Sequence, residues 1–204
     1  MTGRITSGSK TVDKCFVVLQ VISDNLRGQI GRDHGLRLVD IALKADFELY
    51  NVFMKNNNLR SVAYDYMVAL AEQTSETVYL GVLNGEEVSY VEKVDGPLPI
   101  RPHTPIGGRN KLYCTGLGKA MLSVADPDLV TTVMRGPREP ATAHTILDGQ
   151  TLLDELALCR ERGYSVDNME SQSDVRCVGA PIFNSLGHVF AAISISGPAF
   201  RITE

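Results

Sequence analysis

Tryptophan is absent from this 204-residue chain, and cysteine is scarce. The four cysteines lie too far apart to predict a disulfide framework or a Cys-x-x-Cys metal site. They are Cys15, Cys114, Cys159 and Cys177. Reduced and mostly buried thiols are the ordinary interpretation of such a pattern.

Motifs of catalysis and metal binding are also missing. The four histidines share no ligand spacing with one another or with cysteine or carboxylate neighbours, so we expect them on the surface or in loops. They are His34, His103, His144 and His188. No Gly-x-Ser-x-Gly elbow occurs, and Cys177 stands inside a β-rich run rather than at a helix start that would lower its pKa. We therefore expect neither an enzyme nor a cofactor or metal.

Long apolar runs are missing as well. No stretch approaches the roughly 18 to 20 residues that span a bilayer, and the polar N-terminal residues lack a signal peptide's apolar core. Hydrophobic residues make up 44% and charged residues 22%, as in ordinary globular proteins. We expect a cytosolic protein that does not contact membranes.

The charge is small and unevenly placed. The whole chain carries −4, but residues 1–37 carry +3, which leaves −7 for the remainder. This asymmetry permits a basic surface facing DNA and an acidic body. It is weak support by itself, because short segments often reach such a charge by chance.

Helical periodicity marks several segments. Apolar spacings of three and four predict helices over residues 11–24, 36–55 and 59–71, with a glycine-rich boundary at residues 28–35. Further helices are predicted over residues 116–124, after Asp126 as a cap with Pro127 in first position, and over residues 151–162 before Gly163.

Two pairs of β-rich runs lie between these helices. Residues 77–83 and 86–94 flank Asn84-Gly85, which predicts a hairpin with a type I′ turn. Residues 175–183 and 188–196 form a second pair, and residues 98–101 read as an edge strand or loop entry. The order of elements favours an α+β fold with an antiparallel sheet and flanking helices.

Polar residues in the second half are candidates for a site. The segment Gly116-Leu117-Gly118-Lys119 lacks the residues of a Walker loop, and either brings backbone amides close to a small carboxylate or serves tight packing. Asp167 is placed in a loop at the end of a sheet, where it lines a site or forms a turn with Asn168. Ser194 and Ser196 share one strand face, which suits a solvated surface or a polar pocket floor.

Several of these segments together resemble the IclR family of bacterial transcription regulators. The resemblance rests on Ala-Ala-Ile-Ser-Ile-Ser-Gly-Pro at 191–198, Arg-Gly-Tyr-Ser-Val-Asp at 162–167 and Arg-Cys-Val-Gly-Ala-Pro-Ile-Phe at 176–183. It extends to residues 112–120, 76–80 and 201–203. It covers residues 35–204 strongly and residues 10–30 weakly.

The resemblance implies a domain organisation. Residues 1–34 are expected to be the remnant of a winged helix-turn-helix, residues 35–58 a linker helix, and residues 59–204 a GAF- or profilin-like domain that binds a small organic acid. The expected effector is a hydroxy, keto or sugar-derived acid of a catabolic pathway. It further implies a homodimer or homotetramer and operator DNA as a partner of the intact protein. The segment between Ile30 and Leu36 is too short to hold the recognition helix, so we expect this chain not to bind an operator specifically, although its parent protein does.

The resemblance also implies which residues meet the effector. Backbone at Gly116 and Leu117 lies against it, and its polar atoms meet an acid, a cysteine and two serines. The matching residues are Asp167, Cys177, Ser194 and Ser196, and Leu117 and Val175 would supply the apolar wall. The predicted function is a ligand-responsive transcription regulator; the alternatives are a sensor module without DNA binding and a small hydrolase that uses Cys177.

Overall fold

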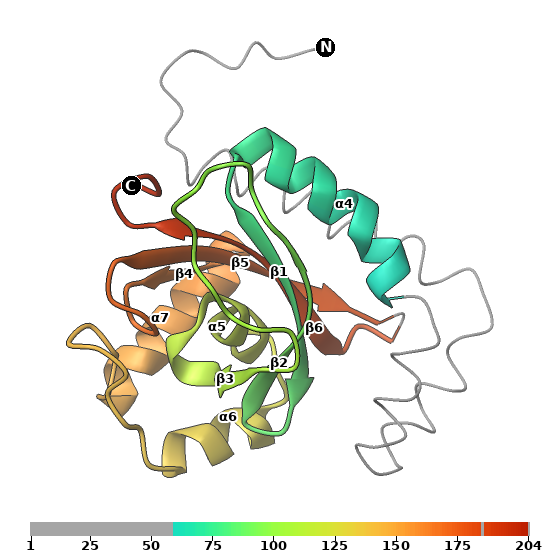
Figure 1. Cartoon of the computed structure of the whole chain (residues 1–204). Helices are drawn as coiled ribbons and strands as arrows, with labels where there is room; N and C mark the ends of the chain where they lie inside the picture. The colour runs from blue at the N-terminus through green and yellow to red at the C-terminus, as the bar shows by residue number, and fades with distance from the viewer. Residues whose placement is uncertain (1–58, 185, 204) are drawn as a thin grey trace, which may run out of the picture.

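A six-stranded antiparallel sheet forms the centre of the molecule (Figure 1). The computed structural model describes residues 59–184 and 186–203. The strand order is β3-β2-β1-β6-β5-β4. The strands are β1 (Thr77–Asn84), β2 (Glu87–Val94), β3 (Arg109–Lys111), β4 (Ser165–Asn168), β5 (Val175–Phe183) and β6 (Val189–Pro198). The antiparallel α+β architecture predicted from the sequence is confirmed.

One face of the sheet is covered by α4 (Leu59–Thr74), which crosses it (Figure 1). The helix buries an apolar stripe at the spacings of three and four that predicted it, so this prediction is confirmed. The stripe consists of Leu59, Ala63, Met67, Leu70 and Ala71. It packs on sheet residues that include Leu80, Val178 and Ile193. Each leucine-sized side chain buried here stabilises the fold by about 1.5 to 3 kcal/mol.

The opposite face is covered by α5 (Gly116–Leu122), with α7 (Gly149–Arg162) outside it and α6 (Pro127–Arg135) beside them (Figure 1). A 3-10 turn, η1 (Leu112–Cys114), leads into α5. Each helix begins at a side-chain cap: Thr115, Asp126 and Asp148 accept hydrogen bonds from backbone amides. The Asp148 cap lets α7 begin two residues before the predicted start, and α5 ends at Leu122.

The β1-β2 hairpin forms where predicted, but its turn is of another type. Asn84 pairs with Glu87, so Gly85 and Glu86 are the two turn residues. Gly85 has a φ of 59°, whereas Glu86 is not among the described residues with positive φ. That combination fits type II′, not the predicted type I′. Asn84 instead donates its side-chain amide to Ser89 Oγ.

Residues 98–101, for which the sequence left an edge strand or a loop entry open, lie in the loop between β2 and β3, so the loop alternative is confirmed. Residues 98–100 are bends, and β3 takes the edge position next to β2 further along the chain, where Arg109 pairs with Ser89. Pro97 and Pro99 have no backbone N–H to donate, so this stretch cannot form a ladder.

Some predictions fall outside the described residues: the helices at 11–24 and 36–55, the boundary at 28–35, and the positions of Cys15 and His34. Within the described part of the chain, no helix has the length and apolar character needed to cross a membrane. That part also contains no cluster of three potential metal ligands. His103, His144 and His188 are exposed, as predicted.

Candidate functional site

The start of α5 lies unusually close to β5. A Cβ on Gly116 would stand 2.9 Å from Cys177 Cβ, and a Cβ on Gly179 would stand 2.5 Å from the Gly116 carbonyl oxygen. Ser165 also donates its hydroxyl to that oxygen at 2.5 Å. Only small residues permit this approach, which sets helix backbone directly over the sheet.

Asp167 is not in a loop, as the sequence suggested, but within β4. The sheet register places Asp167 opposite Cys177 on β5, and Cys177 opposite Ser196 on β6. Three strands therefore carry their polar side chains in one row across the sheet. Asp167 and Ser196 are both buried, with 1% and 3% of their surfaces exposed.

Ser194 and Ser196 lie on the α5 side of the sheet, while Ile193 and Ile195 pack in the α4-side core. This confirms the prediction that the two serines lie on one face of the strand and the two isoleucines on the other. Ser194 pairs with Tyr79 on β1. The serines are thus a pocket floor rather than a solvated surface.

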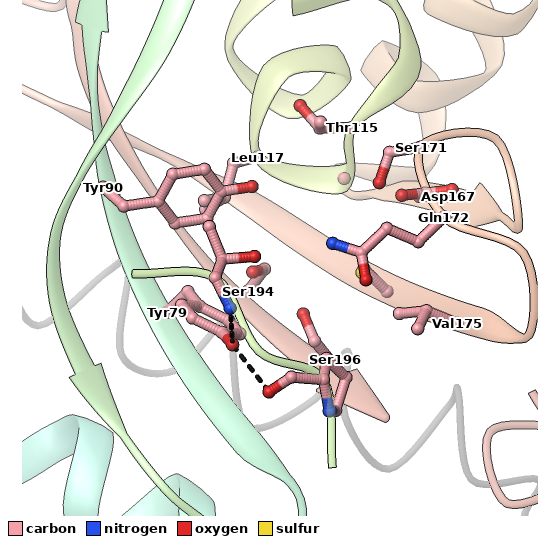
Figure 2. A pocket seen from close by; sticks show the side chains of 14 residues that line it. Tyr79, Tyr90, Thr115, Leu117, Asp167, Ser171, Gln172, Val175, Ser194 and Ser196 are labelled. Atoms are coloured by element: carbon pink, nitrogen blue, oxygen red, sulfur yellow. Dashed lines mark hydrogen bonds between the residues drawn. The ribbon is translucent and has the colours of Figure 1, made fainter. Parts of the chain in front are cut away.

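The loop between β2 and β3 closes one side of this floor through Tyr79. The Tyr79 hydroxyl donates to the Pro102 carbonyl oxygen at 3.0 Å and accepts from the Thr104 amide at 3.1 Å (Figure 2). The Tyr90 ring meets Tyr79 edge-on, with ring centroids 5.4 Å apart. Gln172, from the β4-β5 loop, lies between Asp167 and Val175 on the other side (Figure 2).

These elements enclose a narrow cavity. The space between its lining atoms is about 320 Å³, part of it open to solvent. Seven lining residues were predicted from the sequence: Gly116, Leu117, Asp167, Val175, Cys177, Ser194 and Ser196. Seven others were not: Tyr79, Tyr90, Pro102, Thr104, Thr115, Ser171 and Gln172. Because Tyr79 alternates with the apolar residues Val78 and Leu80, the sequence could have predicted that its side chain lies on the other face of β1. No local pattern indicated that the loop residues would line the cavity.

Asp167 is the acid of the cavity. Its Oδ1 accepts the Glu170 amide at 2.7 Å, whereas its buried Oδ2 makes no hydrogen bond within the described structure. Burial and the nearby Glu170 charge raise the pKa of Asp167 to about 6; the Glu170 amide, Lys119 and the adjacent Ser171 hydroxyl oppose that rise. The carboxyl group therefore takes up its proton near pH 6 rather than near its usual value.

A buried ion-pair network that no sequence pattern predicted lies next to Asp167. Lys119 on α5 is fully buried and donates to Glu170 Oε1 at 2.5 Å and to Glu155 Oε1 at 3.3 Å. Arg162 donates to the same Glu155 oxygen at 2.9 Å. Burial lowers the pKa of Lys119, but the two glutamates outweigh it and raise that pKa overall. All seven residues of α5 are buried, so the helix offers Lys119 no exit to solvent.

Cys177 is a weak candidate for nucleophilic chemistry. Burial and the Asp167 charge raise the pKa of its thiol well above the usual value, so the thiol stays protonated at neutral pH. None of the described residues that line the cavity is a histidine that could act as its base.

The family model described as "Bacterial transcriptional regulator IclR C-terminal" matches residues 52–204. The HTH-type transcriptional regulator KdgR of Escherichia coli K12 is 36% identical over 205 residues, which cover 100% of this chain and 76% of KdgR. The HTH-type transcriptional regulator BhcR of Paracoccus denitrificans is 37% identical over 155 residues, 76% of this chain and 56% of BhcR.

One solved structure is the inducer-binding domain of a PobR double mutant from Acinetobacter in complex with 3-hydroxybenzoic acid. It superposes with a TM-score of 0.64 at 27% identity and covers 72% of this chain and 87% of that domain. The chain spans little more than half the length of BhcR. The family model covers well over half of the chain and all of the described sheet, so the chain belongs to the IclR family of bacterial transcriptional regulators.

Proposed function

We propose that the cavity beside α5 is the effector site of a ligand-responsive transcription regulator, and that its effector is a small hydroxy or keto acid. The observation that carries this is the convergence of the predicted residues. Gly116 and Leu117 come from α5, Asp167 from β4, Val175 and Cys177 from β5, and Ser194 and Ser196 from β6.

The chemistry of the cavity suits such a ligand. Hydroxyl groups of Ser194 and Ser196 offer neutral hydrogen bonds, each with a net value of about 1 kcal/mol and more when the acceptor is charged. Leu117 and Val175 supply apolar surface. The PobR domain, of the same fold, is complexed with 3-hydroxybenzoic acid, which combines a hydroxyl with an acid group.

The remaining parts of the proposal concern the whole protein. Residues 1–34 would belong to a winged helix-turn-helix, residues 35–58 to a linker helix and residues 59–204 to the effector domain. Effector binding would shift the placement of DNA-binding modules in a homodimer or homotetramer on operator DNA. The names of KdgR and BhcR, both HTH-type transcriptional regulators, support this arrangement.

A thermal-shift screen tests the proposal. Lactate, pyruvate and 3-hydroxybenzoate represent hydroxy, keto and aromatic acids, and any that binds the folded state only raises the melting temperature. Ser194→Ala should abolish the shift or reduce it strongly, because the variant removes a floor hydroxyl from the cavity.

Ser123→Ala is the matched control. Ser123 is another buried serine, but its hydroxyl bonds the Ala120 carbonyl oxygen and does not line the cavity. This variant should keep the full shift. If the ligand-induced rise in melting temperature is unchanged in Ser194→Ala, the effector does not bind in this cavity.

A further inference from the structure

The cavity has an unusual charge balance for a site that takes an acid. None of the described residues lining it is lysine, arginine or histidine, and its one ionisable acid, Asp167, is almost fully buried. An effector carboxylate would therefore meet a second carboxylate with no cation between them. Two like charges in a buried site disfavour full ionisation of both groups.

The charged groups around Asp167 do not remove this conflict. The ammonium group of Lys119, on α5, is a nearby positive charge, but it is already paired with Glu170 and Glu155. The Arg162 guanidinium is in turn paired with Glu155. These two cations and two carboxylates balance one another. Asp167 has no ion-pair partner of its own among the described residues, although the nearby Lys119 charge partly opposes the rise in its pKa.

The other titratable neighbours cannot donate charge either. Glu170 faces Asp167 from the β4-β5 loop, Cys177 from β5, Cys114 from η1 and Tyr90 from β2. Burial raises the pKa of each thiol and of the tyrosine, so all three are neutral at physiological pH. Deprotonation of any of them would only add negative charge.

The geometry of the Asp167 carboxyl group leaves room for a proton. Oδ1 is occupied by the Glu170 amide, whereas Oδ2 is buried without a hydrogen-bond partner in the described structure. Protonated at Oδ2, the group becomes a hydrogen-bond donor. A donor at this position turns the repulsion toward an effector carboxylate into a hydrogen bond to a charged acceptor.

We propose that an acid effector enters this cavity together with one proton, which Oδ2 of Asp167 holds against a carboxylate oxygen of the effector. The inference rests on the proposed function, since it concerns the same ligand class and the same cavity. It adds a rule of specificity. Binding of a monoanionic acid requires the uptake of one proton from solvent, whereas binding of an uncharged amide analogue requires none.

The expected pH dependence follows from the proton count. Below about pH 6 Asp167 is already protonated in the free protein, so affinity for the acid is nearly constant. Above about pH 7 each further pH unit should weaken binding roughly tenfold, because a proton must first be taken up. Lactamide, pyruvamide and 3-hydroxybenzamide, the neutral counterparts of the three acids, should show no such decline.

The experiment compares each acid with its amide at about pH 6 and about pH 8 by thermal shift, using the whole chain. Calorimetric titration of a binding acid near pH 8, in buffers of different ionisation enthalpy, then counts the protons taken up. We expect close to one proton per acid bound and close to none for the amide. This count is made on the unaltered protein and does not depend on a variant folding.

Asp167→Asn removes the titrating group and keeps an oxygen for the Glu170 amide, so binding of the acid should become nearly independent of pH. Asp154→Asn, an exposed acid on α7, should leave the pH dependence unchanged. Binding of an acid with equal strength at both pH values and without proton uptake would overturn the inference and leave the proposed function standing. Failure of all three acids to bind at either pH would count against the proposed function itself.

Discussion

At the scale of single residues, Lys119 stands out because its charged side chain is fully buried and therefore needs ionic partners. It is fully buried between α5 and the β4-β5 loop, and it holds two carboxylates. Glu170, one of the two, also binds Asp167 through its amide and accepts the Thr145 hydroxyl at its carbonyl oxygen at 2.7 Å. Lys119 therefore anchors the segment from which Ser171 and Gln172 reach the cavity.

Lys119→Met should lower the free energy of unfolding by about 3 to 5 kcal/mol, because the substitution leaves the buried Glu170 carboxylate without its cation, while Glu155 keeps Arg162. Lys111→Met is the control: the Lys111–Glu87 pair is 2.9 Å long but exposed, and pairs of that kind contribute about 0 to 1 kcal/mol. Urea denaturation of the two variants at neutral pH gives the comparison. Equal, small losses would mean that the buried pair adds little.

At the scale of elements, the distance between α5 and β5 sets the shape of the cavity. The close approach at Gly116 and Gly179 lets helix backbone form one wall and strand side chains the floor. Thr115 fixes the helix start by accepting the Gly118 amide at 3.0 Å while donating to the Lys111 carbonyl oxygen. A change in this packing should therefore shift the backbone of α5 relative to the strand side chains that form the cavity floor.

Gly179→Ala should cost about 1 to 3 kcal/mol of stability, since its Cβ would press on the backbone of Gly116, which cannot rotate away. It should also weaken effector binding through the displaced α5. In Gly149→Ala the new Cβ meets only the movable end of Arg138 at 3.4 Å, so stability should change by less than about 0.5 kcal/mol. Denaturation curves and the ligand-induced shift of both variants test this; an undiminished shift in Gly179→Ala would contradict the expected coupling.

At the scale of the whole molecule, Asp167 links folding to pH. Its pKa is raised from 3.8 to about 6 in the folded state, so the folded protein binds the proton more tightly than the unfolded chain does. The sign follows from this: the contribution of Asp167 to stability is most favourable below about pH 4 and is lost as pH rises to about 6. A shift of this size corresponds to roughly 3 kcal/mol.

Asp167→Asn should therefore gain stability relative to the unaltered protein as pH rises from about 4 to about 6, by up to roughly 3 kcal/mol, and then hold that gain. The difference between the two denaturation free energies, measured at several pH values without ligand, isolates this group from other titrating residues. A difference that stays constant over this range would mean that Asp167 titrates normally.

Local patterns in the sequence determined much of the fold and part of the site. Spacing of three and four predicted α4, alternation put Ser194 and Ser196 on one face, and Gly163 predicted the end of α7, where its φ is 83°. These features depend on near neighbours in the chain. The residues proposed to meet the effector came from the family resemblance, because periodicity alone left each of them with a structural explanation.

Tertiary structure decided how these parts meet. Only the sheet register sets Asp167 beside Cys177 and Cys177 beside Ser196, across three strands. The burial of Lys119, the hydrogen bonds of Tyr79 to the β2-β3 loop and the choice of β3 as the edge strand likewise arise from long-range packing. Strand order and register are set by contacts between distant segments, so the sequence supplied the side chains of the cavity and the folded sheet supplied their arrangement.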